Sequence, residues 1–224
     1  MELAAFRGGV IGVCYSCLTI KEQKMGKKPD ETLKQRIIDG AWDLFYEKGY
    51  ANTTVNDILK KVNTSKGGFY YYFKKKDDLL NSLYVIFDRE YEKFYTNLDK
   101  SQNAILQLEL VSQYVCFFID ANVSYELLTE LYISQLDRRK QEAFLSPDRY
   151  YFRMVREIIE TGQQRGEIRD DIDSVSLAQH ILLLERGILI NWCVRGGSYS
   201  LGAKGHDDFK LYSAFLRPEM AGKE

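Results

Sequence analysis

The chain has 224 residues, of which 45 % are hydrophobic and 28 % charged, and its formal net charge is -1. This composition is typical of one or two globular domains and excludes a wholly disordered chain. The longest stretch without a charged residue, residues 8–20, is shorter than the ~20 apolar residues that a membrane-spanning helix needs. Four cysteines are too few for a disulfide scaffold at this length. We therefore expect a cytoplasmic protein without a membrane partner.

The charge is unevenly distributed along the chain. Between residues 24 and 76, twelve lysines and arginines stand against six aspartates and glutamates, so this segment carries +6 and the remainder -7. A basic segment joined to an acidic remainder indicates an anionic partner at one end of the molecule. Ordinary variation of a protein surface explains the same imbalance equally well, so charge alone does not decide the function.

The first 24 residues do not resemble a signal peptide, because Glu2 precedes the single Arg7 and glycines dilute the apolar run. Cys14 and Cys17 have the spacing of a redox pair or half a zinc site, but no second pair follows. We expect translation to start at Met25, with residues 1–30 an N-terminal extension that is either unfolded or an artefact of start-site choice. A signal sequence or a redox pair is the alternative.

Proline and glycine positions predict an all-α protein. No proline occurs between residues 30 and 146, and no glycine between residues 69 and 161, which permits long helices and leaves no turn glycines for a β-rich fold. A glycine- and serine-rich stretch at residues 196–205 predicts a loop. The predicted helices are residues 31–48, 55–62, 66–72, 76–98, 102–120, 122–137, 149–165, 173–194 and 206–216.

Residues 54–73 predict two short helices joined by a tight turn. Thr54 and Ser65 are each placed to cap the helix that follows, and Asn63 tolerates the left-handed conformation that such turns use. Two helices with this connection form a helix-turn-helix, whose second helix enters the major groove of DNA. Phe69 and Phe73 are four residues apart and are expected to face the core.

The second helix has a surface suited to nucleic acid. Gly67 and Gly68 would allow a close approach to DNA, although glycine costs about 1 kcal/mol relative to alanine inside a helix. At least one of three consecutive tyrosines, residues 70–72, must point outward, where its hydroxyl is able to donate to a phosphate. Three lysines follow and attract phosphates.

This pattern resembles the TetR (tetracycline-repressor-like) family of transcriptional regulators over about residues 33–80. The matching residues are Gly49, Thr54, Asp57, Ile58, Ser65, Lys66, Tyr70, Tyr72, Phe73, Lys76, Leu79 and Leu80. Asn63 departs from the glycine usual in the turn, and Gly68 from a residue that is more often threonine or alanine. The resemblance implies a three-helix DNA-binding domain at residues 31–78 and a helical ligand-binding and dimerisation domain at residues 79–218.

The resemblance also implies which residues contact DNA. Phosphate contacts are expected from Thr54, Tyr70, Tyr72 and Lys76. Positions near base edges or the backbone are expected for Asn56, Ser65, Lys66, Gly67, Gly68 and Tyr71. Lys66 is the expected direct reader, because lysine donates to O6 and N7 of guanine. Lys60 and Lys61 are expected on the solvent side of their helix.

In this family the remaining helices bind an effector. Aromatic helices here are expected to enclose a cavity for an apolar or aromatic molecule, with a filled core as the alternative for each residue. The predicted lining residues are Tyr114, Phe117, Phe118, Tyr132 and His180. For His180 a hydrogen-bonded core histidine is the more common explanation.

Helix 173–194 is apolar around much of its circumference and is expected to pair with its copy in a homodimer. Gly187 and Trp192 resemble a feature of the family's penultimate helix, and the predicted interface residues are Leu184, Ile188 and Trp192. A twofold dimer would present two recognition helices to DNA half-sites about 34–36 Å apart. His206 is expected to start the last helix.

No catalytic, metal-binding or cofactor motif is present in the sequence: it contains no HExxH, no P-loop and no nucleophile elbow. We therefore expect no enzyme activity, no metal and no cofactor. The leading hypothesis is a ligand-responsive dimeric regulator, most often a repressor in this family, that a small apolar or aromatic molecule releases from a double-stranded operator. The alternative is an all-helical small-molecule-binding protein whose helix-turn-helix is structural.

Overall fold

The structure is a computed structural model that describes residues 33–136 and 146–218. Within these ranges every regular element is helical, which confirms the all-α prediction. The predicted N-terminal extension, including Cys14 and Cys17, lies outside the described residues. Contacts group the chain from Leu33 onward into one compact unit, and the domain boundary between residues 78 and 79 stays a prediction.

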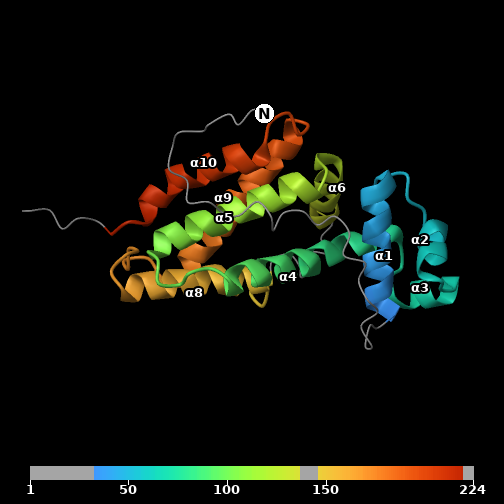
Figure 1. The fold of residues 1–224 in the computed structure, drawn as a ribbon, viewed down its shortest axis with the longest axis horizontal. Helices are drawn as coiled ribbons and strands as arrows, with labels where there is room; N and C mark the ends of the chain where they lie inside the picture. Colours follow the sequence, from blue (N-terminus) through green and yellow to red (C-terminus); the bar gives the residue numbers. More distant parts are fainter. Residues whose placement is uncertain (1–32, 137–145, 219–224) are drawn as a thin grey trace, which may run out of the picture. The chain divides into compact units, whose positions relative to one another are not determined.

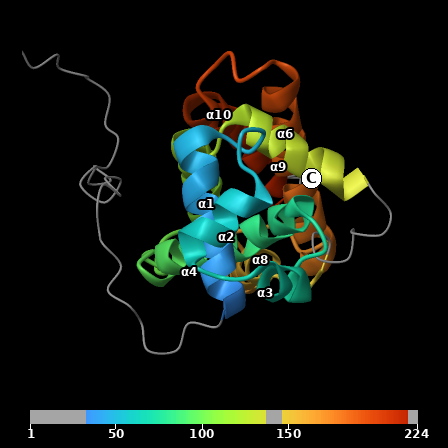
Figure 2. The ribbon, with the colours of Figure 1, turned by 90° about the vertical axis from the view of Figure 1, so that its right-hand side faces the viewer.

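The N-terminal part contains three helices, α1 (Leu33–Lys48), α2 (Val55–Val62) and α3 (Lys66–Tyr72), of which α2 and α3 form the helix-turn-helix. α2 and α3 both pack against α1 (Figures 1 and 2). Ile37, Ile58 and Phe69, one from each helix, are fully buried and form the centre of this small core. The turn contains the predicted left-handed residue, since Asn63 has a φ of 52°.

The segment predicted as one helix at residues 76–98 is divided into two. Residues Lys76–Ser82 form a 3-10 helix, η2, and α4 (Leu83–Thr96) begins only after it. A 3-10 run of this length is unusual, because its hydrogen bonds are poorer than those of an α-helix and such runs seldom exceed 3–4 residues. The Asp78 carboxylate, which accepts from the backbone N–H groups of Lys74 and Lys75 at 2.9 and 3.1 Å, fixes the start of η2.

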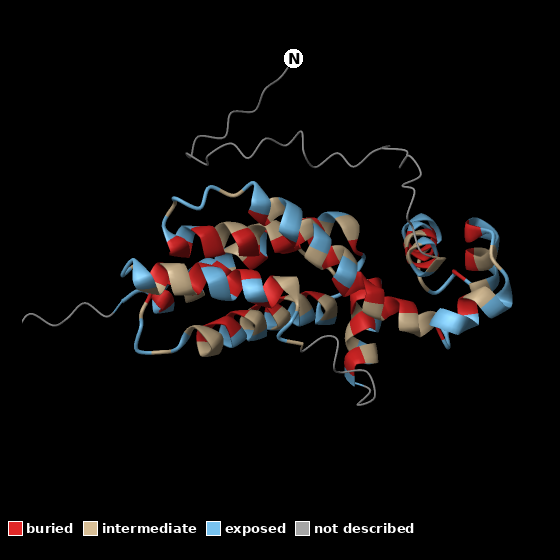
Figure 3. Ribbon diagram, turned by 90° about the horizontal axis from the view of Figure 1, so that it is seen from below, coloured by how far each residue is buried: buried red, intermediate tan, exposed pale blue. Residues whose placement is uncertain are grey.

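The remaining helices pack around one another with their buried faces inward (Figure 3). They are α5 (Ala104–Asn122), α6 (Tyr125–Leu136), α8 (Tyr150–Gln164), α9 (Ser174–Val194) and α10 (Leu201–Ser213), followed by the short 3-10 helix η3 (Ala214–Leu216). Among the described helices only α5 is long and apolar enough to cross a membrane, and more than half of that stretch is buried against other helices. That burial is the character of a core helix.

The loop predicted at residues 196–205 is only half correct. Gly196 and Gly197 have positive φ and form the turn, but α10 already begins at Leu201, so His206 lies within this helix and does not start it. The prediction was wrong for residues 201–205 because it took every glycine as a loop residue, whereas Gly202 allows two helices to pack closely. A Cβ atom there would lie 2.3 Å from the Phe117 ring on α5, the helix with which α10 makes its most extensive contact.

Candidate DNA-binding surface and ligand cavity

Helix α3 divides into a buried and an exposed face. Phe69 and Phe73 are buried, as predicted, whereas all three tyrosines at positions 70–72 are exposed, Tyr71 to 81 % of its surface. Lys66, at the first position of the helix, is exposed as well. A helix that hides two phenylalanines and presents a lysine and three phenols to solvent has the donors that phosphates and base edges require.

Two adjacent glycines in α3 differ in their surroundings. A Cβ atom at Gly67 would meet only the Ser65 hydroxyl, at 3.8 Å, so nothing within the protein requires glycine there. A Cβ atom at Gly68 would lie 2.6 Å from Thr64 Oγ1 and 3.3 Å from Leu33. Packing inside the domain therefore accounts for Gly68, and only Gly67 leaves the helix open to a close approach from outside.

Two of the predicted phosphate ligands have donors engaged within the protein. The Thr54 hydroxyl donates to Asp57 at 2.6 Å and its backbone N–H donates to the same carboxylate at 2.8 Å, so both donors serve the cap of α2. Lys76 Nζ donates to the carbonyls of Tyr50 and Thr53 at 2.7 and 2.9 Å and lies 4.0 Å from the Tyr50 ring centroid. Burial lowers the pKa of this amine. Lys76 thus ties the α1–α2 turn to η2 and keeps one N–H for another partner.

The other predicted DNA contacts lie on or beside the exposed side of α2 and α3. Asn56 and Ser65 are exposed, and the Ser65 hydroxyl accepts from the Gly68 N–H at 3.1 Å as the cap of α3. Lys60 and Lys61 are exposed, as expected. Lys61 pairs with Glu47 and Asp43 of α1 at 3.1 and 3.5 Å, so its charge is partly compensated within the domain.

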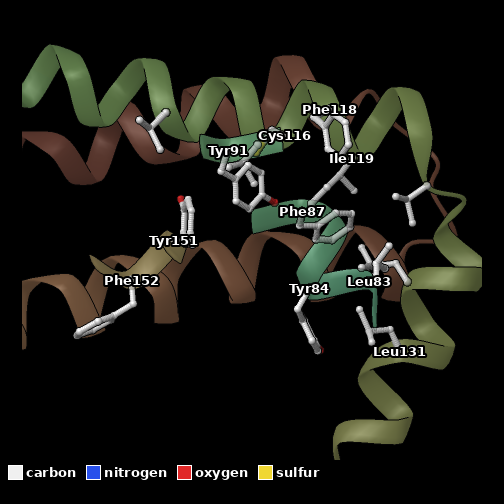
Figure 4. Packing of buried hydrophobic residues seen from close by; sticks show 14 of the residues in the cluster. Leu83, Tyr84, Phe87, Tyr91, Cys116, Phe118, Ile119, Leu131, Tyr151 and Phe152 are labelled. Carbon is white, nitrogen blue, oxygen red and sulfur yellow. The ribbon is translucent and has the colours of Figure 1, made fainter. Parts of the chain in front are cut away.

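A cavity of about 70 Å³ lies among five helices of the C-terminal part. Figure 4 shows part of its aromatic wall, where Tyr91 of α4 lies beside Tyr151 of α8 and Phe87 of α4 lies beside Phe118 of α5. The lining residues are Tyr84, Phe87, Tyr91, Val115, Ile119, Leu128, Leu131, Tyr132, Arg149, Tyr151, Leu182, Glu185, Arg186 and Leu189. α4, which follows η2 directly, supplies three of these rings.

Of the five residues predicted to line the pocket, only Tyr132 does so. Tyr114 stacks on Phe94 with ring centroids 4.2 Å apart, and Phe118 is buried in the core between α4 and α5. Phe117 packs against Gly202 of α10, and His180 is exposed, so it is neither a pocket residue nor a core histidine. The aromatic run of α5 faces more than one neighbour, and its sequence does not say which face meets the cavity.

The cavity also has polar walls that the sequence reading missed. Glu185 is fully buried and accepts a hydrogen bond from the Tyr151 hydroxyl at 2.6 Å. Burial raises the pKa of this carboxyl to about 7. Arg149 forms a two-pronged ion pair with Asp88, at 2.7 and 3.4 Å, with its guanidinium 4.7 Å from the Tyr84 ring centroid. In the sequence, a charged residue within an apolar helix, such as Glu185 in α9, is the signal that could have indicated these polar walls.

The predicted dimer residues face the interior of the protomer. Ile188 and Trp192 are only 6 % and 5 % exposed, and Leu184 packs partly against the core. The opposite face of α9 is the apolar one that solvent reaches. Together with α10 and η3 it exposes an apolar stripe, which we define as Leu183, Gly187, Ile190 and Val194 of α9, Leu211 of α10 and Phe215 of η3.

Comparison with known proteins identifies the N-terminal segment. Residues 37–83 match the family model described as "Bacterial regulatory proteins, tetR family". These residues span most of α1 and all of α2, α3 and η2. A search of the curated proteins finds no match to the chain.

Several solved structures share the fold of the whole described chain. The regulator FadR from Bacillus subtilis, solved with stearoyl-CoA, is 23 % identical, with a TM-score of 0.60 over 82 % of this chain and 100 % of that one. FadR from Thermus thermophilus, a repressor solved with lauroyl-CoA, is 17 % identical, with a TM-score of 0.65 over 85 % and 99 %. The regulatory protein TetR from Rhodobacter sphaeroides is 21 % identical, with a TM-score of 0.58 over 83 % and 100 %.

Proposed function

We propose that this chain, which carries the DNA-binding domain of the tetR family of bacterial regulatory proteins, is a cytoplasmic transcriptional regulator that binds an operator as a homodimer. The observation that carries the proposal is the exposed surface of α3, the helix on which Lys66 and three tyrosines are exposed and Gly67 is unobstructed. A structural helix-turn-helix would have no need of that face. We take the function to be repression, released by a small effector.

The effector site that we propose is the cavity among α4, α5, α6, α8 and α9. Drug-sized ligands occupy pockets of about 300–1,000 Å³, so the cavity of about 70 Å³ would have to widen for them. Two solved structures of similar fold, both of FadR, contain stearoyl-CoA and lauroyl-CoA, whose long acyl chains support an effector with an apolar part.

Ligand binding would reach the DNA-binding domain through α4 and η2. Tyr84, Phe87 and Tyr91 on α4 line the cavity, and η2 connects α4 to the helix-turn-helix. A second connection runs through α6, where the Gln135 side chain donates to Asn81 of η2 at 2.8 Å. An effector would act by binding one arrangement of these helices more tightly than the other, because equal affinity shifts no equilibrium.

The exposed apolar stripe of α9 and α10 is the proposed dimer interface. Gly187 lies in the middle of α9 with no atom of another residue near its Cβ position. Glycine destabilises a helix interior by about 1 kcal/mol relative to alanine, and nothing within the protomer compensates for this. A second helix that approaches closely at Gly187 would do so.

The direct test is DNA binding by the Lys66→Ala variant. Fluorescence anisotropy with the DNA that flanks the gene should show salt-dependent, sequence-selective binding by the unaltered protein. Lys66→Ala should lose about 1–3 kcal/mol of binding free energy, whereas Lys60→Ala, an exposed lysine on α2, should lose much less. Equal losses in both variants, or no selective binding to any fragment of the genome, would favour a helical binding protein with a structural helix-turn-helix.

A further inference from the structure

The exposed side of α3 has a definite centre. An α-helix turns by about 100° per residue, and the fully buried Phe69 marks the direction of the core. Tyr71 follows two residues later, about 200° around the helix, and Gly67 precedes by two residues, which places it about 160° around in the same sense. Both positions therefore point away from the core. Because they are four residues apart, they are neighbours on the outermost face of the helix.

The solvent exposure of the three tyrosines agrees with this geometry. Tyr71 is 81 % exposed, whereas Tyr70 and Tyr72, on the two flanks of the helix, are 51 % and 38 % exposed. When a helix enters the major groove, its outermost face meets the base edges and its flanks face the phosphates on either side. Of the three tyrosines, Tyr71 is thus the one that is placed toward the bases.

The ring of Tyr71 is held by a neighbouring ring. Its centroid lies 4.8 Å from that of Tyr72, with an angle of 89° between the two ring planes. This is the edge-to-face arrangement that aromatic pairs favour. Tyr72 in turn lies beside the buried Phe73, with ring centroids 6.5 Å apart. The Tyr71 ring therefore loses less conformational freedom on binding than an isolated surface tyrosine would lose.

Gly67 determines how this ring would meet the bases. A Cβ atom there would meet only the Ser65 hydroxyl, at 3.8 Å, so the backbone of α3 is able to come close to DNA at this point. A close approach leaves little depth for a tyrosine side chain that points straight at the base edges. The ring of Tyr71 must then lie along the floor of the groove, where its apolar face, and not its hydroxyl, contacts the bases.

We propose that Tyr71 reads a thymine in each operator half-site by packing its ring on the 5-methyl group of that base. This inference rests on the proposed function and names a base that the operator must contain. Thymine is the one DNA base that presents a methyl group in the major groove. An aromatic ring that covers this methyl group removes apolar surface from water, and that gain is absent when another base occupies the position.

The test removes single methyl groups from the operator. Selection from random double-stranded DNA with the full chain identifies the operator, and uracil then replaces thymine at one position at a time, in both half-sites together. Uracil pairs as thymine does and lacks only the methyl group. Fluorescence anisotropy should show about tenfold weaker binding to one of these DNAs, as expected when two methyl groups are no longer buried.

Variants assign this loss to the ring. Tyr71→Ala should bind the thymine and uracil operators with equal affinity, whereas Tyr71→Phe keeps the ring and should keep the tenfold difference. Tyr46→Ala is the matched control and should also keep it, because this tyrosine is 53 % exposed and lies on α1, outside the two helices of the helix-turn-helix. Low salt strengthens the phosphate contacts and keeps the weaker complexes measurable. Circular dichroism checks that each variant is folded.

Three results would overturn the inference: a selected operator in which no uracil weakens binding, a difference that survives Tyr71→Ala, or a difference that Tyr71→Phe abolishes, which would make the hydroxyl the reader. Each of these results leaves the proposed function intact, because selective binding to an operator is then already established. If the selection yields no operator, the regulator itself is refuted, and this inference with it.

Discussion

At the scale of single residues, Glu185 is a titratable side chain that the fold buries, with only 6 % of its surface exposed. It is the only carboxyl among the buried polar residues of the described ranges, and it lies on the cavity wall against Tyr151. Desolvation disfavours its charged form more than the Tyr151 hydroxyl stabilises it, which accounts for the raised pKa. Its protonation must therefore differ between the folded and unfolded states.

This difference predicts a pH dependence of stability. Between the ordinary glutamate pKa of 4.5 and the folded value of about 7, the folded state binds more protons than the unfolded one. The free energy of unfolding should thus fall as pH rises through this window and level off above it. A shift of this size corresponds to a change on the order of 3 kcal/mol.

Urea denaturation at pH 5, 6, 7 and 8, at constant protein concentration, measures this contribution. Glu185→Gln keeps an acceptor for Tyr151 and should flatten the pH dependence, so the difference between the two proteins isolates this residue. Glu157→Gln, a glutamate on α8 whose side chain is 59 % exposed, should leave the dependence unchanged. Parallel curves for Glu185→Gln and the unaltered protein would refute the assignment.

At the scale of elements, two helices each contain a glycine, but for opposite physical reasons. In α3, Gly67 has open space around its Cβ position. In α10, Gly202 lies against the Phe117 ring, and its N–H donates to Asp120 of α5 at 3.1 Å. The first is open to an outside partner and the second joins two helices of the protomer.

Gly67→Ala should separate affinity from stability. Alanine favours the helix, so the free energy of unfolding should stay the same or rise by up to about 1 kcal/mol. Operator affinity should fall, because the added methyl group holds the first turn of α3 away from DNA. Urea denaturation and anisotropy on the same variant test this, and unchanged affinity would show that Gly67 does not lie against the operator.

Gly202→Ala should have the reverse effect. The added methyl group would overlap the Phe117 ring, and overpacking of this kind costs about 1–3 kcal/mol of stability. At a temperature where the variant is fully folded, its operator affinity should match that of the unaltered protein. A stable Gly202→Ala variant would contradict the close packing of α10 on α5.

At the scale of the whole molecule, the exposed apolar stripe of α9 and α10 indicates a surface that binds a partner. Leu183 is 60 % exposed, and Val194 and Leu211 are each 80 % exposed. Large exposed apolar patches mark interaction sites in soluble proteins. A twofold pairing through this stripe would present two copies of α3 to a palindromic operator.

Leu183→Glu should convert the dimer into monomers. A charge within the stripe would be buried in the interface without a partner, which strongly opposes association. Sedimentation velocity should show the change in mass, and operator affinity should fall with it. Leu136→Glu is the control, because this leucine of α6 is also exposed, to 80 %, and does not belong to the stripe. If the Leu183→Glu variant still forms a dimer, the interface lies elsewhere on the protein.

The sequence determined the local features of this protein, because they depend on neighbouring residues. Thr54 and Ser65 cap α2 and α3 as predicted, Asn63 adopts the left-handed turn, and Phe69 and Phe73 are buried. These features alone specify the helix-turn-helix and its exposed face.

Only the tertiary structure decided which side of each apolar helix faces which neighbour. α9 is apolar on nearly all sides, so nothing in its own sequence distinguishes the inner Ile188 and Trp192 from the outer Leu183 and Val194. In the same way, the glycine-rich sequence around Gly202 predicts a loop. Only the packing of Gly202 against Phe117 of α5 explains why a glycine lies in this helix. By contrast, the sequence does predict the helix on which Glu185 lies. That its carboxyl faces the cavity follows from the packing of five helices, which bring together residues as distant in sequence as Tyr84 and Leu189.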